Sequence, residues 1–241
     1  MDMLEIMKKE EAYCSDHRDM PGELQKKAKM LCWRYNQTSP EALFFAIGDV
    51  SGKGIPASLL MASTISLLRT LSSGSNSPSQ IAYSLNNSIA ERNEADMFVT
   101  FFIGMLDLRT GVMKYCNAGH TPPVLTSPDR TVAFFEMQSD LPLGILKNHD
   151  YQEYTYRFVS GSGILLYTDG VTDAENEKNE FYTRERLLEI VTQNQELHPR
   201  EFIRSIINDI QSHIKSHELS DDLSMLTKNH KIYRFFFVIF K

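Results

Sequence analysis

The sequence predicts an α+β fold in a single domain. Two helix-like segments follow one strand-like run, several strand-like runs joined by short turns come next, and two more amphipathic segments follow. Groups of strands and groups of helices are typical of α+β folds, whereas regular strand and helix alternation is typical of parallel sheets. The chain has 241 residues, of which 42% are apolar, so it can form one substantial core.

The first elements are indicated by apolar periodicity and by turn residues. The apolar run Leu43–Ile47 has the length of a strand and ends at Gly48-Asp49. A glycine-rich turn then leads into a helical pattern over Pro56–Leu71. Ser77-Pro78-Ser79-Gln80 combines a capping residue, a proline at the first helical position and a glutamine three residues after the cap. This motif predicts a second helix ending at about Arg92.

The later elements follow from the same patterns. Arg109-Thr110-Gly111 suits a short hairpin between two β-rich runs, and amphipathic helices are predicted at Thr183–Thr192 and Pro199–Ser212. Further strands are predicted at Phe98–Leu108, Val112–Asn117, Thr131–Met137, Tyr151–Phe158, Gly163–Thr168 and Leu223–Thr227.

Both ends of the chain differ from the middle. Residues 1–40 are polar, only Glu23–Trp33 suggests a helix, and this segment is expected to be helical or poorly ordered. The main domain is predicted over residues 41–228, and residues 229–241 form an atypical apolar tail. The tail's run Phe235–Phe240 is too short to span a bilayer, and the N-terminus has no apolar signal region.

Charge and cysteine content exclude some functional classes. The net charge is -6 and no block of lysine or arginine is present, so a nucleic-acid partner is not expected. The three cysteines, Cys14, Cys32 and Cys116, are odd in number and far apart, which argues against disulfides and thiolate zinc sites. A cytoplasmic protein is therefore expected.

Three segments with an aspartate at a predicted turn, here called acidic corners, are the candidate reactive sites of this chain. Gly48-Asp49-Val50, Thr168-Asp169-Gly170 and Ser220-Asp221-Asp222 each lie at the edge of a strand-like run. One aspartate beside a glycine is ordinarily explained by turn formation. If the three corners converge, their oxygens would favour Mg²⁺ or Mn²⁺. Two such ions could acidify a shared water and direct it at phosphorus without a protein nucleophile.

Other phosphate-binding and hydrolytic mechanisms fit the sequence poorly. A cysteine phosphatase needs an arginine six residues after its cysteine, where this chain has Met20, Thr38 and Pro122. The segment Gly48–Gly54 resembles a P-loop, but only three residues separate Gly48 from Gly52, and Gly54 replaces the Ser/Thr. Gly161-Ser162-Gly163 lacks the first glycine of a nucleophile elbow.

Two further residues have open interpretations. Lys53, in the turn before a predicted helix, could attract an anion or could simply be exposed to solvent. His120 follows a predicted strand on a tight loop, where a histidine is more often structural than catalytic. No proton-transfer role is assigned to it.

Taken together, these segments resemble the SpoIIE/RsbU group of PPM (protein phosphatase 2C-like) serine/threonine phosphatases. The resemblance covers Leu43 to Leu226 and implies a four-layer α-β-β-α sandwich of two mainly antiparallel sheets. It also implies hydrolysis of phosphoserine or phosphothreonine by a metal-activated water. The matching pieces are FFAIGDVSGKGIPASLLMA from Phe44, MFVTFFIGMLDLRTG from Met97, YCNAGHTPPVL from Tyr115, LPLGI from Leu141, GILLYTDGVTDAEN from Gly163 and SDDLSML from Ser220.

The resemblance also implies the site residues and the partner. Asp49 would bridge two Mn²⁺ or Mg²⁺ ions, the Val50 carbonyl would assist the second ion, and Asp169 and Asp221 would complete the first site. The implied substrate is a phosphorylated regulatory protein, a STAS-type anti-sigma-factor antagonist, and a homodimer is compatible with the resemblance. The predicted helices over residues 56–71 and 78–92 resemble a pair that switches the metal site. Supporting positions are Gly48, Gly170 and Asp222.

One family motif is missing. Family members usually carry Gly-Gly-Asp in a strand before the Gly-Asp corner, and that aspartate serves the metal site. Met30–Pro40 reads MLCWRYNQTSP, with no acid and no glycine pair. This difference predicts a weak or absent second ion, so the alternative is a pseudophosphatase, a regulatory binding module with an impaired metal site.

Overall fold

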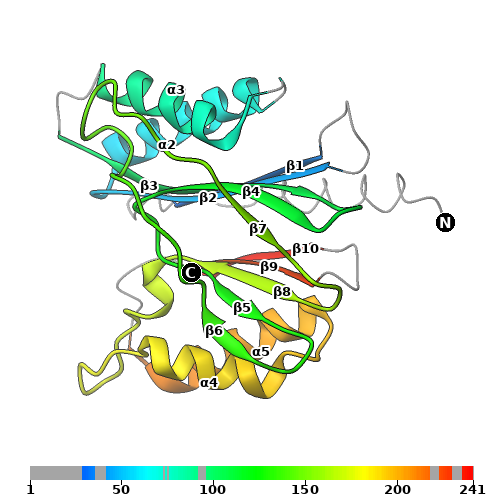
Figure 1. Ribbon diagram of the computed structural model, residues 1–241. Coiled ribbons are helices and arrows are strands. Elements are labelled where there is room, and N and C mark those ends of the chain that lie inside the picture. The colour runs from blue at the N-terminus through cyan, green and yellow to red at the C-terminus, as the bar shows by residue number, and fades with distance from the viewer. Residues whose placement is uncertain are drawn as a thin grey trace.

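The predicted α+β class is confirmed by two antiparallel sheets flanked by helices. The computed structural model describes residues 29–35, 42–72, 74, 76–91, 96–217, 223–229 and 235–240. Its strands form two five-stranded sheets in the orders β1-β2-β3-β4-β7 and β10-β9-β8-β5-β6. Figure 1 shows α2 and α3 on the outer face of the first sheet and α4 and α5 on the outer face of the second.

Apart from β1, β5 and β10, the elements occur along the chain in the predicted order. The first sheet contains β1 (Lys29–Tyr35), β2 (Ala42–Val50), β3 (Val99–Asp107), β4 (Val112–Ala118) and β7 (Tyr154–Arg157). The second contains β5 (Val124–Thr126), β6 (Val132–Phe134), β8 (Gly163–Tyr167), β9 (Leu223–Asn229) and β10 (Phe235–Phe240). The helices are α2 (Ile55–Leu71), α3 (Pro78–Ala90), α4 (Arg184–Asn194) and α5 (Pro199–Ile214), and the 3-10 turn η2 spans Asp169–Val171.

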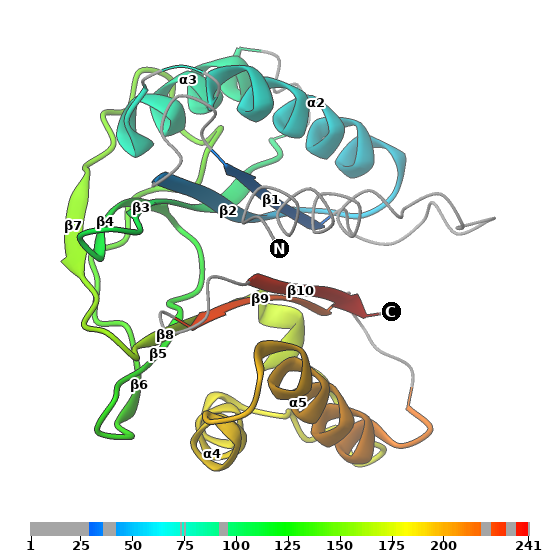
Figure 2. The same ribbon diagram turned by 90° about the vertical axis from the view of Figure 1, so that its right-hand side faces the viewer.

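Alternating side chains of the central strands build three apolar layers. In β2, Phe44 packs toward α2 and α3, whereas Phe45 packs between the sheets. In β8, Leu165 and Tyr167 pack toward α4 and α5, whereas Leu166 packs between the sheets. Successive residues of a strand point to opposite faces, so continuous apolar runs are typical of strands covered on both sides. The four layers are visible in Figure 2.

The start of α3 confirms the predicted capping motif. The Ser77 hydroxyl accepts a bond from the Gln80 backbone N–H at 3.3 Å, and the Gln80 side chain accepts from the Ser77 backbone N–H at 2.8 Å. Pro78 occupies the first helical turn, where a missing N–H costs nothing.

Both ends of the described chain add a strand to a sheet. The helix suggested over Glu23–Trp33 is wrong for Lys29–Trp33, because β1 pairs antiparallel along the length of β2. Helix propensity is a weak preference that such backbone pairing overrides. The apolar tail supplies β10, which pairs with β9. The short strand β5 was not predicted, and residues 1–28 lie outside the described part.

The helices carry no membrane-spanning segment in the described part of the chain. None of them combines the length and the apolar character that crossing a bilayer requires.

Candidate functional site

The first acidic corner lies at the end of β2. Asp49 is 8% exposed and stands opposite Thr100 of β3, and Val50 stands opposite Val99. After the strand, the Ser51 backbone N–H donates to the Phe98 carbonyl at 2.8 Å, and the Phe98 N–H donates to the Ser51 hydroxyl at 2.7 Å. The corner is therefore held against the start of β3.

Gly48 fits this corner because it lacks a side chain. A Cβ at this position would lie 2.3 Å from Cδ2 and 2.6 Å from Cε2 of Phe101, a ring that is fully buried. The glycine next to Asp49 therefore allows the Phe101 ring of β3 to cross over the backbone of β2.

The second acidic corner follows β8. Asp169 begins η2, where its carbonyl accepts bonds from the Thr172 hydroxyl at 3.1 Å and from the Asp173 N–H at 2.8 Å. The preceding Thr168 is bonded to Ser224 of β9 in both directions: its N–H donates to the Ser224 carbonyl at 3.0 Å, and its hydroxyl accepts from the Ser224 N–H at 3.2 Å. The start of β9 thus lies beside this corner.

His120 connects the two corners through its ring. Its Nδ1 lies 3.1 Å from the Thr100 hydroxyl in the first sheet, and its Nε2 lies 3.2 Å from the Tyr167 carbonyl in the second. Thr100 is the pairing partner of Asp49, and Tyr167 precedes Asp169 by two residues. The ends of β2 and β8 therefore meet at one side of the sandwich. We call this region, defined by Asp49, Thr100, His120, Tyr167 and Asp169, the aspartate edge.

The donors at the aspartate edge suit a hard divalent cation. A carboxylate as buried as that of Asp49 requires hydrogen bonds or a nearby cation to stay ionised. Carboxylate and carbonyl oxygens are the ligands that Mg²⁺ and Mn²⁺ prefer. Within the described residues, no three acidic, histidine or cysteine side chains form a metal-binding group. Asp221 and Asp222, the third predicted corner, lie outside the described residues.

Gly170, a predicted supporting residue, and Lys53, whose interpretation was left open, both lie within the described residues. Gly170 is buried within η2, and Lys53 is exposed in the turn before α2. In that turn Gly52 and Gly54 have φ of 86° and 82°, a conformation that favours glycine. An anion-binding role for Lys53 stays a prediction.

Two buried titratable groups, the Cys116 thiol and the Tyr167 hydroxyl, have raised pKa values. Burial raises the pKa of the Cys116 thiol to about 12, with smaller contributions from Asp140 and Glu153. A thiol with this pKa is protonated at neutral pH and is a poor nucleophile. Burial likewise raises the pKa of the Tyr167 hydroxyl to about 12.

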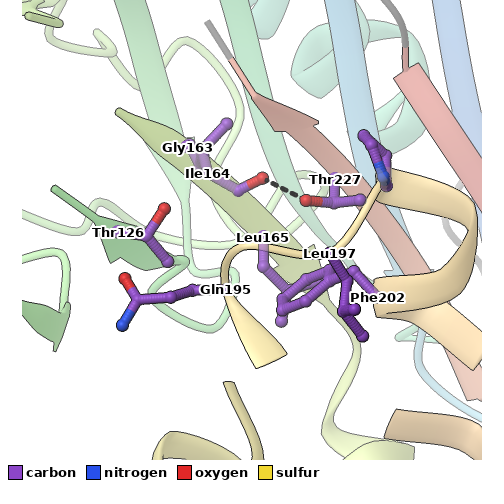
Figure 3. Close-up of a pocket in the computed structure, with 9 residues that line it drawn as sticks. Thr126, Gly163, Ile164, Leu165, Gln195, Leu197, Phe202 and Thr227 are labelled. Atoms are coloured by element: carbon purple, nitrogen blue, oxygen red, sulfur yellow. Dashed lines mark hydrogen bonds between the residues drawn. The ribbon is translucent and has the colours of Figure 1, made fainter. Parts of the chain in front are cut away.

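A small cavity at the other end of β8 is not a substrate site. Figure 3 shows it between β8, β9 and the start of α5, beside the bond from the Thr227 hydroxyl to the Ile164 carbonyl at 3.1 Å. Its volume of about 20 Å³ holds roughly one water molecule. Its lining includes Gly163, the first residue of β8, whereas Asp169 follows the last.

Solved structures share this architecture. The SiaA-PP2C domain of Pseudomonas aeruginosa superposes with a TM-score of 0.73 at 15% identity, covering 86% of this chain and 84% of that one. The phosphatase-domain structure of SpoIIE from Bacillus subtilis gives 0.68 at 17% identity, covering 84% and 61%. These likenesses and the two helix-covered sheets define a PP2C-like fold.

The family follows from the sequence comparison. The family model described as Stage II sporulation protein E (SpoIIE) matches residues 39–231, and the chain belongs to this family. Phosphoserine phosphatase RsbU of Bacillus subtilis is 28% identical over 193 residues, which cover 80% of this chain and 57% of RsbU. Protein IcfG of Synechocystis is 27% identical over 212 residues, covering 76% and 33%. The chain thus spans little more than half of RsbU and a third of IcfG.

Sequence reasoning did not identify Thr100 of the aspartate edge, or Asn117, which holds the backbone of His120. Thr100 was part of a predicted strand with no assigned role, and Asn117 was noted only as part of a loop motif. Their polar side chains within apolar strands were the available signal, since buried polar groups need partners. His120 was noted, but its contacts with both sheets were not foreseeable.

Proposed function

We propose that the chain is a metal-dependent phosphoprotein phosphatase acting on phosphoserine or phosphothreonine. The observation that carries the proposal is the aspartate edge, where Asp49 lies near the end of β2 and Asp169 follows β8, a strand of the other sheet, within a fold of the SpoIIE family. RsbU and RsbP of Bacillus subtilis are both named phosphoserine phosphatases, which supports the same reaction class here.

The roles we propose for the residues are those that the family resemblance implies, and their oxygen donors suit hard divalent ions. Asp49 would contact two Mg²⁺ or Mn²⁺ ions, with the Val50 carbonyl assisting one of them. Asp169 and Asp221 would complete the set, because Asp221 precedes the first residue of β9 by two positions and β9 starts beside Thr168. When bound, such ions lower the pKa of water and neutralise phosphate charge. A structure of the relative RsbX contains magnesium.

Within this proposal the protein side chains position the metal ligands and do not themselves react with the phosphate. The Ser51 and Phe98 bonds hold the Asp49 corner, and η2 holds the Asp169 backbone. Gly48 leaves room for the Phe101 ring at the first corner, and Gly170 and Asp222 would support Asp169 and Asp221. No side chain needs to form a covalent intermediate.

The substrate we propose is a phosphorylated regulatory protein in sigma-factor control, a STAS-type anti-sigma-factor antagonist. It rests on the family membership and on the relation to RsbU. Incubation of the chain with such a phosphoprotein, followed by mass spectrometry, would detect the loss of phosphate.

The direct test compares two matched substitutions. Asp169→Asn removes a proposed ligand, and we expect Mn²⁺-dependent hydrolysis of a phosphoserine peptide to fall by more than about 100-fold, since even indirect partners of a metal contribute 10–100-fold. Asp129→Asn makes the same change in the exposed turn between β5 and β6, and activity should be unchanged. Activity without metal, or equal activity of the two variants, would refute the proposal.

A pseudophosphatase is the second candidate, and the register of β1 favours it. Lys29 stands opposite Asp49, and Met30 opposite Gly48, so β1 places no acidic residue beside the corner. Calorimetric titration with Mn²⁺ separates the candidates: two bound ions with turnover support the phosphatase, whereas one weak site without turnover supports the binding module.

A further inference from the structure

We propose that Thr100 and His120 are positioning residues that set the spacing between the metal-binding corners of Asp49 and Asp169. The proposal rests on the proposed function and adds residues that contact neither substrate nor metal. It starts from the line of contacts Asp49, Thr100, His120 and Tyr167, which crosses from one sheet to the other.

The direction of each hydrogen bond follows from donor capacity. The Tyr167 carbonyl can only accept, and it accepts from the Thr121 hydroxyl at 2.8 Å and faces His120 Nε2 at 3.2 Å. Nε2 therefore carries a hydrogen. In the neutral ring Nδ1 is then an acceptor at 3.1 Å from the Thr100 hydroxyl. The single hydrogen of this hydroxyl has a second acceptor in the Asp49 carbonyl at 3.5 Å, and the shorter distance favours donation to Nδ1. The ring thus accepts from the first sheet and donates to the second.

The ring has little freedom to move. His120 is 4% exposed, and Asn117 holds its backbone by accepting from the His120 N–H at 2.9 Å and donating to the His120 carbonyl at 3.1 Å. The preceding Gly119 has φ of 75°, and a Cβ there would lie 2.6 Å from Cγ of Pro142. The loop is therefore fixed on both sides, and the ring acts as a spacer of defined length.

The location of this polar link indicates a role beyond packing. The layer between the sheets is built from apolar side chains such as Phe45, Phe102 and Leu166. The hydrophobic effect is non-directional, whereas hydrogen bonds fix distance and direction. The link occurs beside the partner strand of Asp49 and two residues before Asp169. Misplacement of reacting groups by about 1 Å can lower a rate about 100-fold.

The test uses threonine variants of matched shape. Thr100→Val removes the hydroxyl of this partly buried residue, and Thr100→Ser restores it. Thr227→Val removes the hydroxyl of a buried threonine, which donates to Ile164 near the far end of β8. Mn²⁺ affinity is measured by calorimetry, kcat and KM with para-nitrophenyl phosphate, and folding by the thermal midpoint. We expect Thr100→Val to weaken Mn²⁺ binding about 10–100-fold and to lower kcat more than KM changes.

The other variants complete the pattern. Thr100→Ser should recover Mn²⁺ affinity to within about threefold, as a replacement that keeps the donor. Thr227→Val should lose stability but keep the wild-type Mn²⁺ affinity. His120→Gln keeps a donor near Nε2 and His120→Asn keeps an acceptor near Nδ1, so each should retain one of the two bonds and show intermediate affinity.

The outcomes also separate this inference from the proposed function. If the wild-type chain hydrolyses phosphate with Mn²⁺ but Thr100→Val binds Mn²⁺ as tightly as Thr227→Val does, the positioning role is refuted while the phosphatase stands. If the wild-type chain binds no Mn²⁺ and has no turnover, both the positioning role and the proposed phosphatase function are refuted.

Discussion

Asn86 of α3 forms hydrogen bonds with the loop after β6, and removing its side chain should greatly lower the free energy of unfolding. Asn86 is fully buried, its Oδ1 accepts from the Gly144 N–H at 2.8 Å, and its Nδ2 donates to the Leu146 carbonyl at 2.9 Å. The Tyr151 hydroxyl also donates to Oδ1 at 3.3 Å. The perturbation we consider is Asn86→Ala.

The loss of free energy of unfolding in Asn86→Ala depends on which of the former partners of Asn86 can bind water instead. The Gly144 N–H is buried and would lose its acceptor, at about 1–3 kcal/mol, whereas the carbonyl of the exposed Leu146 can bind water, at about 0.5–1.5 kcal/mol. Tyr151 keeps the Pro142 carbonyl at 3.4 Å as a second acceptor. We therefore expect a loss of about 2–4 kcal/mol in the free energy of unfolding.

The neighbouring Asn87 provides the matched control. It lies on the same helix and accepts from the N–H of Asn148 in the same loop at 2.7 Å, but this contact is exposed. Asn87→Ala should cost about 1 kcal/mol or less. Both substitutions change helix propensity equally, so that contribution cancels.

Urea denaturation followed by circular dichroism measures both variants. Asn86→Ala should also lower the thermal midpoint by about 4–16 °C, at the usual 2–4 °C per kcal/mol for chains of this size. Equal losses for the two variants would refute the reasoning, because burial would then make no difference to the cost.

Two further predictions concern packing and pH. Gly48→Ala should destabilise the fold by about 1–3 kcal/mol and weaken Mn²⁺ binding, because the new Cβ overlaps the Phe101 ring. The control is Gly74→Ala, where the nearest atom to the new Cβ is 3.4 Å away, and it should have little effect. Denaturation measures the stability of both variants, and calorimetry measures their Mn²⁺ affinity. Hydrogen bonds from Arg186 lower the pKa of the Asp209 carboxyl. The wild-type chain should therefore be more stable than Asp209→Asn at pH 7, and this difference in the free energy of unfolding should shrink as the pH falls below about 4. A difference that does not depend on pH would contradict the prediction.

Local patterns in the sequence were sufficient for most elements. The apolar run of β2, the capping motif of α3 and the Arg109–Gly111 hairpin turn each depend on residues within a few positions of one another. Local sterics and hydrogen bonding determine such features, so they are readable without a partner. The strand β1 was misread because its conformation depends on pairing with β2, and β5 is too short to show periodicity.

The candidate site also has features that the sequence indicates and features that only the tertiary structure shows. The sequence by itself indicated the candidate ligands of a hard cation, namely aspartates at or just after strand ends, beside glycines that permit tight corners. Only the tertiary structure decided that Asp49 and Asp169 share an edge and that His120 spans the sheets there. The physical reason is that the stacking of two sheets is set by long-range apolar packing between residues such as Phe45 and Leu166, which no local pattern records.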